Sequence, residues 1–284
     1  MKHPFLLSII CDEISQDPAV AIRLAKEHGL DGVELRSVWD SPVELLSQEQ
    51  TAALKAMLQD AGLKVSGIAS SFLKDDWGND DRAKFDRVVK ACHAFGCDHL
   101  RGFSFWKSED YSDEAFAAYL APYDEILGKE GLTLMLENDP SVNLSTGKDL
   151  ARFFNKYDFK NIGILWDPGN DIYTCGDGCK PYPDEYELLR GAVRHVHIKD
   201  AVHNGKEGVG VAPGTGWLDL KGQLRALVAD GYTGWVALEP HFRLEGEIDE
   251  ELLKRPGGAA FSEGGYEPSK LALELMNKML SELF

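Results

Sequence analysis

The sequence predicts a single (β/α)8 barrel, and three observations lead to this fold class. Short apolar runs rich in β-branched residues alternate eight times with amphipathic helical segments. Several of these segments stop at a glycine, the usual helix terminator. No run is followed by a GxGxxG or GxxxxGK(S/T) loop, which argues against the alternative, an open doubly wound sheet. At 284 residues the chain has the length of one barrel, so we expect residues 1–284 to form a single TIM-barrel domain.

The first four strand–helix units follow one another from the N-terminus. Their strands are expected at 6–14, 31–38, 64–71 and 99–105. The helices after them are expected at 18–28, 48–61, 81–95 and 113–130. Gly29, Gly62 and Gly96 follow the first three of these helices, because glycine readily adopts the left-handed conformation that ends a helix.

The last four units continue the same alternation to the C-terminus. Their strands are expected at 133–139, 161–167, 194–200 and 234–240. Their helices are expected at 147–157, 184–191, 218–230 and 268–283. The stretch between the sixth strand and its helix is rich in glycine and proline, so we expect a loop there.

The charge balance argues against some classes of partner. With 47 acidic and 30 basic residues the net charge is −17, which disfavours nucleic acids and anionic membrane surfaces. No apolar run approaches the ~18 residues of a membrane span. The N-terminal run 5–11 is short, leads directly into Asp12 and Glu13 and lacks a cleavage site, so we interpret it as a buried strand rather than a signal peptide.

The five cysteines suggest a cytoplasmic location. An odd count without a secretory signal is typical of reduced thiols. Cys175 and Cys179 enclose Gly-Asp-Gly in an expected loop, and their spacing matches neither CxxC nor a zinc knuckle. We therefore expect two ordinary loop thiols there, with a metal or redox pair as the alternative.

Strands five to eight each end in a side chain that can bind a metal ion. These are Glu137 in LMLEN, Asp167 in ILWDPGN, His197 in HVHIKD and Glu239 in VALEPHF. They lie 30, 30 and 42 residues apart, about one strand–helix unit each, so all four should face one barrel mouth. Three carboxylates and an imidazole in an apolar mouth would be unstable without a cation. This oxygen-rich set predicts one divalent ion, Mn²⁺ by preference, with Mg²⁺, Co²⁺ or Zn²⁺ as alternatives.

A second histidine, His195, shares the strand of His197. Side chains two residues apart on a strand point to the same face. His195 lies one layer below the mouth, so we expect a hydrogen-bonded core histidine there rather than a metal ligand.

The motifs DGVELR, LEND, WDPGN, HVHIKD, PGTGWLD and LEPHF span nearly the whole chain. They resemble those of the xylose-isomerase-like TIM-barrel superfamily, the sugar phosphate isomerase/epimerase family. The resemblance implies a single divalent ion held by Glu137, Asp167, His197 and Glu239. It also implies that Glu137 and Glu239 form the catalytic acid/base pair on opposite faces of the substrate.

The sequence departs from part of this family at one position. Members that epimerise free ketohexoses usually carry a histidine three residues after the metal-ligand aspartate, where this chain has Asn170. That difference argues against a free-ketohexose epimerase. The superfamily also contains DNA-repair endonucleases with three zinc ions and many more histidines at strand ends. This chain has eight histidines, and His3, His28 and His93 fall outside the expected mouth.

Further residues near the strand ends are candidates for binding substrate. Glu34, Arg36, Arg101, Trp106, Asn170 and Lys199 form this set. The basic members are suited to holding a substrate oxygen, carboxylate or phosphate, and ion pairing with neighbouring acids is the equally weighted alternative. Trp39, Phe72, Trp106 and Trp166 are candidates for an apolar wall, although such residues more often belong to the core. His203, Lys206 and His241 follow strands closely enough to reach a cavity.

The expected function is a metal-dependent isomerase or epimerase of carbohydrate metabolism. Its substrate would be a sugar, sugar phosphate or polyol-derived ketone, and its reaction a proton transfer through an enediolate bound to the metal. The main alternative is a dehydratase of the inosose dehydratase type, followed by an AP-endonuclease-like phosphodiester hydrolase and a binding protein without turnover. We expect a small carbohydrate as partner, no nucleic acid and no membrane. A homo-oligomer is compatible with the sequence, because related barrels commonly pair, but the sequence does not decide the oligomeric state.

Overall fold

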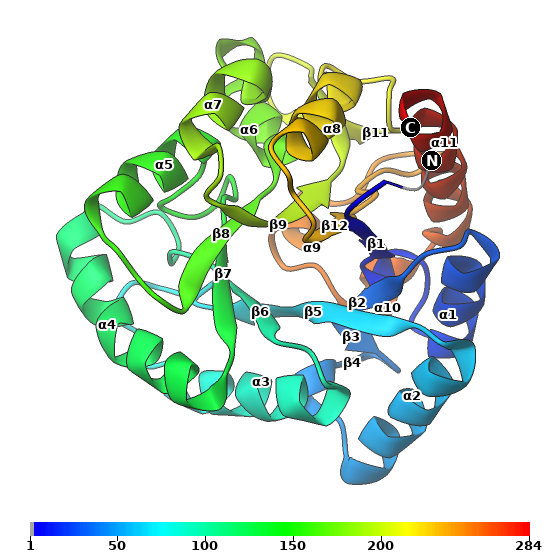
Figure 1. Ribbon diagram of the computed structural model, residues 1–284, viewed down its shortest axis with the longest axis horizontal. Coiled ribbons are helices and arrows are strands. Elements are labelled where there is room, and N and C mark those ends of the chain that lie inside the picture. The colour runs from blue at the N-terminus through cyan, green and yellow to red at the C-terminus, as the bar shows by residue number, and fades with distance from the viewer. Residues whose placement is uncertain (1–2) are drawn as a thin grey trace.

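Eight parallel strands form the barrel wall in the computed structural model, which describes residues 3–284 (Figure 1). In chain order they are β1 (Leu6–Ile9), β2 (Gly32–Leu35), β5 (Lys64–Phe72), β6 (His99–Gly102), β7 (Thr133–Glu137), β8 (Ile162–Trp166), β9 (Val193–Ile198) and β12 (Trp235–Leu238). Around the barrel the order is β1-β12-β9-β8-β7-β6-β5-β2. A parallel bridge between Ile10 and Glu34 joins the two ends of this order. The predicted (β/α)8 barrel is therefore confirmed.

Helices surround the strands, as the ring of coiled ribbons in Figure 1 shows. They are α1 (Pro18–Glu27), α2 (Gln48–Ala61), α3 (Arg82–Phe95), α4 (Asp113–Glu130), α5 (Gly147–Lys156), α8 (Leu220–Ala229) and α11 (Tyr266–Leu283). Side chains of Asp17, Ser47, Ser112 and Thr146 accept hydrogen bonds from the first turns of α1, α2, α4 and α5, which explains where these helices begin. No helix of the described chain is long and apolar enough to cross a membrane.

The strands alternate between two environments, as β9 illustrates. Val196 and Ile198 belong to the apolar core, whereas His195 and His197 contact the carboxylate of Glu34, which comes from β2 on another part of the barrel wall. Because successive residues of a strand point to opposite faces, the aliphatic side chains pack beneath the helices and the polar ones face the barrel interior. This polar interior continues to the carboxyl ends of the strands.

The segment after β8 differs from the prediction. In place of one helix at 184–191, the chain forms α6 (Pro168–Cys175), a π-helical turn (Pro181–Glu185) and the short α7 (Tyr186–Leu189). The start of α6 is stabilised because Asp167 accepts hydrogen bonds from the N–H groups of Gly169 and Asn170, and Pro168 occupies the first helical position. The glycine and proline content that predicted a loop instead marks a capped helix start.

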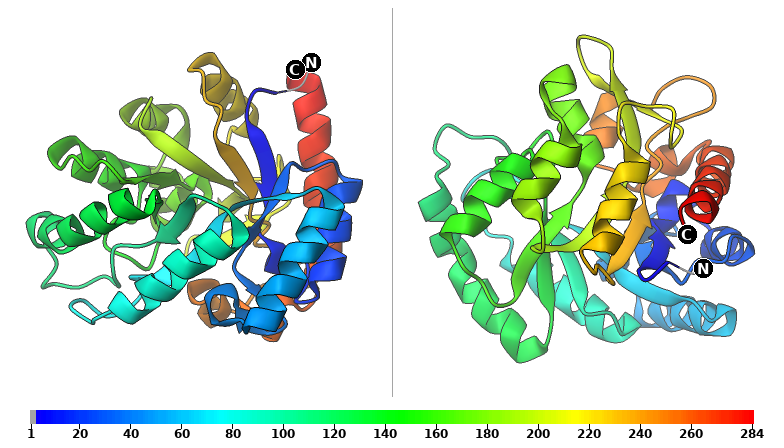
Figure 2. Two further views of the ribbon diagram at one scale, coloured as in Figure 1. Left: turned by 60° about the horizontal axis from the view of Figure 1, so that its bottom comes forward. Right: turned by 45° about the horizontal axis from the view of Figure 1, so that its top comes forward.

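Six further short elements were not predicted. The antiparallel pairs β3–β4 (Ser37–Val38 and Ser41–Pro42) and β10–β11 (Asp200–His203 and Gly208–Val211) follow β2 and β9. Helices α9 (Glu250–Lys254) and α10 (Gly258–Ser262) lie between β12 and α11. Figure 2 shows these orange helices gathered at one end of the barrel. They are too short for a periodic sequence pattern to reveal them.

The two loop cysteines correct another prediction. Cys175 and Cys179 are joined in a disulfide, and their Cα atoms lie 5.4 Å apart. A 3-10 turn at Gly176–Gly178 folds the chain back between them, which brings the two residues within the range that a disulfide needs. The expectation of two separate thiols is therefore wrong for this pair. Cys11, Cys92 and Cys97 are free and buried.

Candidate metal centre and its cavity

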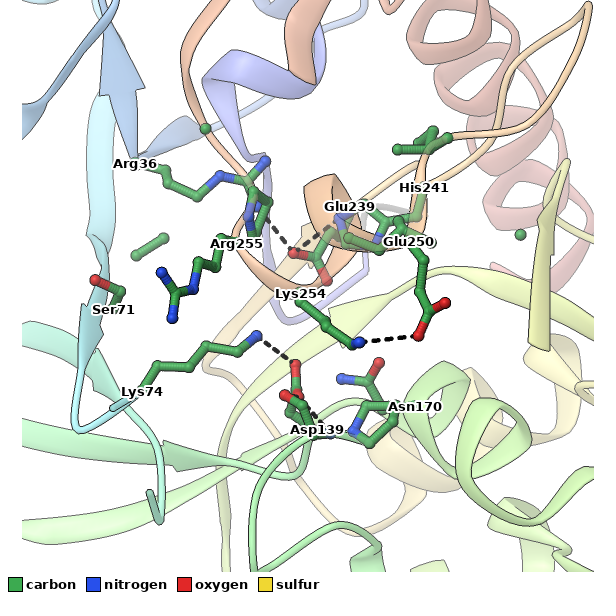
Figure 3. A pocket seen from close by; sticks show the side chains of 18 of the residues that line it. Arg36, Ser71, Lys74, Asp139, Asn170, Glu239, His241, Glu250, Lys254 and Arg255 are labelled. Atoms are coloured by element: carbon green, nitrogen blue, oxygen red, sulfur yellow. Dashed lines mark hydrogen bonds and ion pairs between the residues drawn. The ribbon is translucent and has the colours of Figure 1, made fainter. Parts of the chain in front are cut away.

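A cavity of about 1070 Å³ opens at the carboxyl ends of the strands. Strand-end side chains line its floor, including Glu137 and Glu239, and the segment 246–258 with α9 lines its outer part. Figure 3 shows Arg36 and Glu239 within this cavity, with Lys254 and Arg255 reaching in from the outer segment. The cavity is the size of a small-molecule site.

The four predicted metal ligands meet at the floor of this cavity, where Glu137 and Glu239 line it and Asp167 and His197 lie just behind them. Glu137, Asp167, His197 and Glu239, here called the ligand quartet, each offer one ligand atom, and these atoms all lie within 4.8 Å of one another. All four side chains are buried. Three carboxylates and one imidazole at this spacing fit a divalent ion such as Mn²⁺, Mg²⁺ or Zn²⁺.

Cationic side chains hold two carboxylates of the quartet in place. Lys199 Nζ donates to Asp167 Oδ2 at 2.5 Å and to Glu239 Oε2 at 2.8 Å. The second oxygen of Glu239 accepts a hydrogen bond from Arg36 Nη1 at 3.2 Å, drawn in Figure 3. Buried carboxylates need such partners, because removing charge from water without compensation is costly.

Arg101 holds the carboxylate of Glu137 in place. Its Nη1 donates to Glu137 Oε2 at 3.0 Å and lies 3.7 Å from Glu239 Oε1. Burial raises the pKa of Glu137, but Arg101 and His197 outweigh this effect and hold the pKa below its usual value. Burial likewise opposes ionisation of Glu239, yet His241 and Lys199 hold its pKa well below the usual range. Both carboxylates are therefore ionised at neutral pH.

The other two members of the quartet titrate differently. Burial raises the pKa of Asp167 to about 6, against the opposing charge of Lys199 and with the help of Glu239. Burial lowers the pKa of His197, but the nearby carboxylates of Glu34 and Glu137 raise it by a larger amount. The pKa of His197 therefore lies well above that of an ordinary histidine. Without a divalent cation, the quartet thus retains protons near neutral pH.

The WDPGN motif explains how Asp167 reaches the quartet. One oxygen of Asp167 caps α6, which leaves the other for Lys199 and the metal site. Gly169 lets the stem of Lys199 pass, because a Cβ atom at this position would lie 2.4 Å from Lys199 Cγ. Asn170 lines the cavity, and its Nδ2 donates to the carbonyl oxygen of Asn138 at 2.7 Å.

The last residue of HVHIKD organises the PGTGWLD motif. Asp200 accepts hydrogen bonds from the backbone N–H groups of Gly214, Gly216 and Leu218. A Cβ atom on Gly216 would lie 2.1 Å from Asp200 Oδ1, so only glycine permits this contact. The two motifs therefore form one structural unit beside the cavity.

The structure separates the expected substrate-binding residues into two groups. Arg36, Arg101, Asn170 and Lys199 line the cavity. Glu34 and Trp106 are not among the lining residues. Glu34 lies deeper, between His195 and His197, and the Trp106 ring lies 5.6 Å from the Arg255 guanidinium.

Glu34 and His195 form a layer directly beneath the quartet. Glu34 Oε2 is 2.9 Å from His195 Nε2, and Glu34 Oε1 is 3.1 Å from His197 Nε2. Burial raises the pKa of Glu34, but His197 and His195 outweigh it and hold the pKa well below its usual value. The expected core role of His195 agrees with this geometry, whereas a direct role of Glu34 in binding substrate does not.

Sequence reasoning missed two acids that hold Arg36 at the cavity wall. Asp12 and Glu13 follow β1 in a 3-10 turn (Cys11–Glu13), and both bind the Arg36 guanidinium, at 3.0 and 2.7 Å. His241 lines the cavity, with its Nε2 3.0 Å from Glu13 Oε1 and 3.4 Å from Glu239 Oε1. The signal was present, because two acids directly after the first strand occupy a strand-end position.

The expected aromatic wall is largely absent from the described cavity lining. Phe72 and Trp166 are fully buried in the core, and Trp39 is not among the lining residues. Phe103 lines the cavity instead, with its ring 5.0 Å from the Arg101 guanidinium and 4.6 Å from Lys74 Nζ. Of the three loop candidates, Lys206 and His241 line the cavity and His203 does not.

Comparison with known families places this geometry in context. The family model described as xylose isomerase-like TIM barrel matches residues 22–255. An inosose dehydratase of Bacillus velezensis is 26% identical over 153 residues, which cover 48% of this chain and 50% of that protein. The chain thus spans about half the length of the inosose dehydratase that it matches. A Streptomyces coelicolor protein assigned as a hydroxypyruvate isomerase is 26% identical over 273 residues, covering 82% of this chain and 88% of that protein.

Solved structures show the same fold over almost the whole chain. A D-allulose 3-epimerase from Methylomonas sp. in complex with D-allulose superimposes with a TM-score of 0.70 at 20% identity, covering 98% of each chain. The IOLI protein with a bound zinc atom gives a TM-score of 0.70 at 18% identity, covering 99% of each chain. At these identities the likeness concerns the fold.

Proposed function

Because the chain belongs to the xylose isomerase-like TIM-barrel family, we propose that it is a divalent-metal-dependent isomerase or epimerase of a sugar, sugar phosphate or polyol-derived ketone. The observation that carries the proposal is the ligand quartet, in which Glu137 and Glu239 reach one point from different strands. Relatives with enzymatic names support catalysis rather than binding alone.

The quartet would hold one divalent ion. Such an ion supplies Lewis acidity, which stabilises negative charge on substrate oxygens when a neighbouring C–H bond breaks. Mn²⁺ is our preferred ion because three of the four ligands are carboxylates. The zinc-bound IOLI neighbour supports a divalent ion without favouring manganese.

The residues of the chain assign the proton transfers. Glu137 and Glu239 come from β7 and β12, which β8 and β9 separate in the barrel wall. A substrate carbon held between them has one carboxylate on each face. Since both carboxylates are ionised, either accepts the proton from that carbon and can return it. The carboxylate that takes the proton returns it on its own face, and delivery to the neighbouring carbon gives isomerisation. Epimerisation needs a proton delivered to the opposite face of the same carbon; the second glutamate would supply it after taking one up from solvent, while the first releases its proton to solvent.

Cationic residues at the cavity floor would orient the two carboxylates that transfer the proton. Lys199, Arg36 and Arg101 contact the same carboxylates that would carry the proton. Their N–H groups fix where those carboxylates point, which is the main requirement for proton transfer over hydrogen-bond distance. Asn170 Nδ2 is occupied by the carbonyl of Asn138, so the amide oxygen of Asn170 is the group available to a substrate hydroxyl.

Metal affinity should rise with pH. His197, whose pKa is raised well above the ordinary value, and Asp167, with a pKa of about 6, must lose protons before they bind a metal ion. Raising the pH favours that loss, so we expect Mn²⁺ to bind more tightly at about pH 8 than at about pH 6, roughly tenfold per pH unit for each proton released. Titration calorimetry in two buffers of different ionisation enthalpy measures both the Mn²⁺ affinity and the number of protons released. An affinity independent of pH contradicts this protonation of the quartet.

Dehydration is the second candidate reaction, because inosose dehydratases are prominent among the relatives. The same proton removal, followed by loss of a hydroxyl group from the next carbon, releases water and leaves an unsaturated ketone. Lys199 Nζ lies beside Asp167 and Glu239 at the cavity floor, where an acid for the departing hydroxyl is required. This reaction uses the same site and differs in the fate of the first intermediate.

One experiment tests both candidates. The Mn²⁺-loaded protein is incubated in D₂O with ketoses, inososes and sugar phosphates, and products are followed by NMR and mass spectrometry. Isomerisation or epimerisation places deuterium on a carbon next to the carbonyl without loss of mass from the skeleton, whereas dehydration gives a product lighter by one water. Metal-free protein is the control. Absence of exchange and of product across the panel contradicts the proposed function.

A further inference from the structure

Glu34 occupies the position where the barrel closes. Its backbone forms the parallel bridge to Ile10 that joins β2 to β1. Between Val33 and Glu34 the pairing of β2 with β5 shifts register, because β5 has one extra residue, Ser66, between the partners of Val33 and Glu34. Such irregularities redirect side chains and often adjoin active sites. The Glu34 side chain is buried in the barrel interior, with 2% of its surface exposed.

From this position Glu34 reaches a strand that is not its neighbour. β1 and β12 lie between β2 and β9 around the barrel, yet the Glu34 carboxylate contacts both histidines of β9. The pairing of β8 with β9 also shifts register, directly before His195. Register shifts therefore precede both Glu34 and His195, the two residues that lie beneath the quartet.

The chemistry of these contacts fixes the protons. An ionised carboxylate only accepts hydrogen bonds, so His195 Nε2 and His197 Nε2 must each carry the hydrogen that points to Glu34. The other nitrogen of His197, Nδ1, then faces Glu137 Oε1 at 3.2 Å and Glu239 Oε2 at 3.7 Å. That nitrogen is the one whose lone pair a metal in the quartet would use.

We propose that Glu34 is a positioning residue that holds His197 with Nε2–H downward and Nδ1 toward the quartet, and that His195 keeps the Glu34 carboxylate from turning away. The inference rests on the proposed metal site and adds a residue that touches neither metal nor substrate. Carboxylates that orient a ligating histidine in this way commonly change metal affinity by about 10- to 100-fold when they are replaced.

Replacing Glu34 with glutamine should disturb the histidine more than its size suggests. A glutamine offers one acceptor oxygen and one NH₂ donor, so it can accept from only one of the two imidazoles. If its NH₂ group faces His197, that ring must accept through Nε2 and keep its proton on Nδ1, where the metal should bind. If its oxygen faces His197 instead, its NH₂ group faces His195. His195 Nε2 then loses its acceptor, and the side chain at position 34 is no longer held in place by His195.

The test measures metal binding directly. We expect Glu34→Gln to bind Zn²⁺ and Mn²⁺ about 10- to 100-fold more weakly than the natural chain, by calorimetry on metal-free protein. In the Zn²⁺-loaded natural chain, ¹⁵N NMR should show His197 with hydrogen on Nε2 and metal on Nδ1, and the variant should lose this pattern. Glu185→Gln is the matched control, because Glu185 is also a buried carboxylate but accepts its hydrogen bond from the Lys148 backbone rather than from a histidine of the quartet.

Two further variants keep the inference open to refutation. Should Glu34→Gln fail to fold, as judged by circular dichroism, Glu34→Asp retains the charge but is one methylene too short to span both histidines, and it should also weaken metal binding. His195→Gln frees one carboxylate oxygen without touching His197 and should have an intermediate effect. Natural affinity in the folded Glu34 variants, with His197 still bound through Nδ1, overturns the proposal. Because no substrate is used, failure of the proposed reaction cannot be mistaken for failure of this inference.

Discussion

Replacing Glu239 with glutamine should lower kcat by about 100- to 10,000-fold, the contribution of a well-placed acid or base. The glutamine has nearly the same shape but cannot accept the substrate proton, and its uncharged oxygen is a weaker metal ligand. The side chain lies on the cavity floor, above the apolar packing of β12, so the fold should persist. Deuterium exchange with the substrate found in the panel measures the loss.

Two controls separate the causes of this loss. Metal content and activity at saturating Mn²⁺ show how much of it comes from weaker metal binding. Glu250→Gln replaces an exposed carboxylate on the rim of the same cavity and should leave kcat within about twofold. Full activity of Glu239→Gln would remove Glu239 from the mechanism, whereas loss of activity in Glu250→Gln would indicate a general effect of charge at the cavity.

The quartet was predictable because barrel geometry repeats along the chain. Each member follows an apolar run at an interval close to one strand–helix unit, and parallel strands bring such positions to one end of the barrel. Glu34 belonged to the same pattern, yet its role was not predictable. Glu34 lies under the quartet next to a register shift between β2 and β5, and such shifts leave no mark in a hydrophobic pattern.

The same reasoning explains what sequence analysis missed around Arg36. The expected strand 6–14 ends at Ile9 in the structure, and Asp12 and Glu13 lie in the turn beyond it. Treating these acids as part of a buried strand hid their strand-end position. Arg36 was expected near the substrate with an ion pair as the alternative, and the structure gives it three carboxylate partners while it still lines the cavity.

Replacing Arg36 with methionine should therefore destabilise the fold by about 3–5 kcal/mol, the usual consequence of removing one partner from a buried ionic group. The Arg36 side chain is 6% exposed. Its guanidinium contacts Asp12, Glu13 and Glu239 and lies 4.6 Å from the Phe261 ring. Methionine preserves most of the apolar stem but leaves three carboxylates without this charge. Thermal unfolding should show the loss as a fall in Tm of roughly 10 °C.

The pH dependence distinguishes this ionic effect from a packing effect. Burial raises the pKa of Glu13, but His241 and Arg36 bring it below the usual value. A carboxylate with a lowered pKa in the folded state contributes stability above its unfolded pKa of about 4.3, and this contribution disappears as the pH falls through the folded value. Without Arg36 that contribution is reduced, so the difference between variant and natural chain should be largest near neutral pH and should shrink in acid.

Matched substitutions complete the argument for Arg36. Arg36→Lys keeps the charge but lacks the planar fork that reaches Asp12 and Glu13 together, so it should lose less stability than methionine but more than a surface replacement. Arg82→Met breaks an ion pair with Asp86 that is about half exposed, and should cost no more than about 1 kcal/mol. A loss for Arg36→Met as small as that of Arg82→Met, or one unchanged between neutral and acidic pH, would show that burial of the carboxylates does not depend on Arg36.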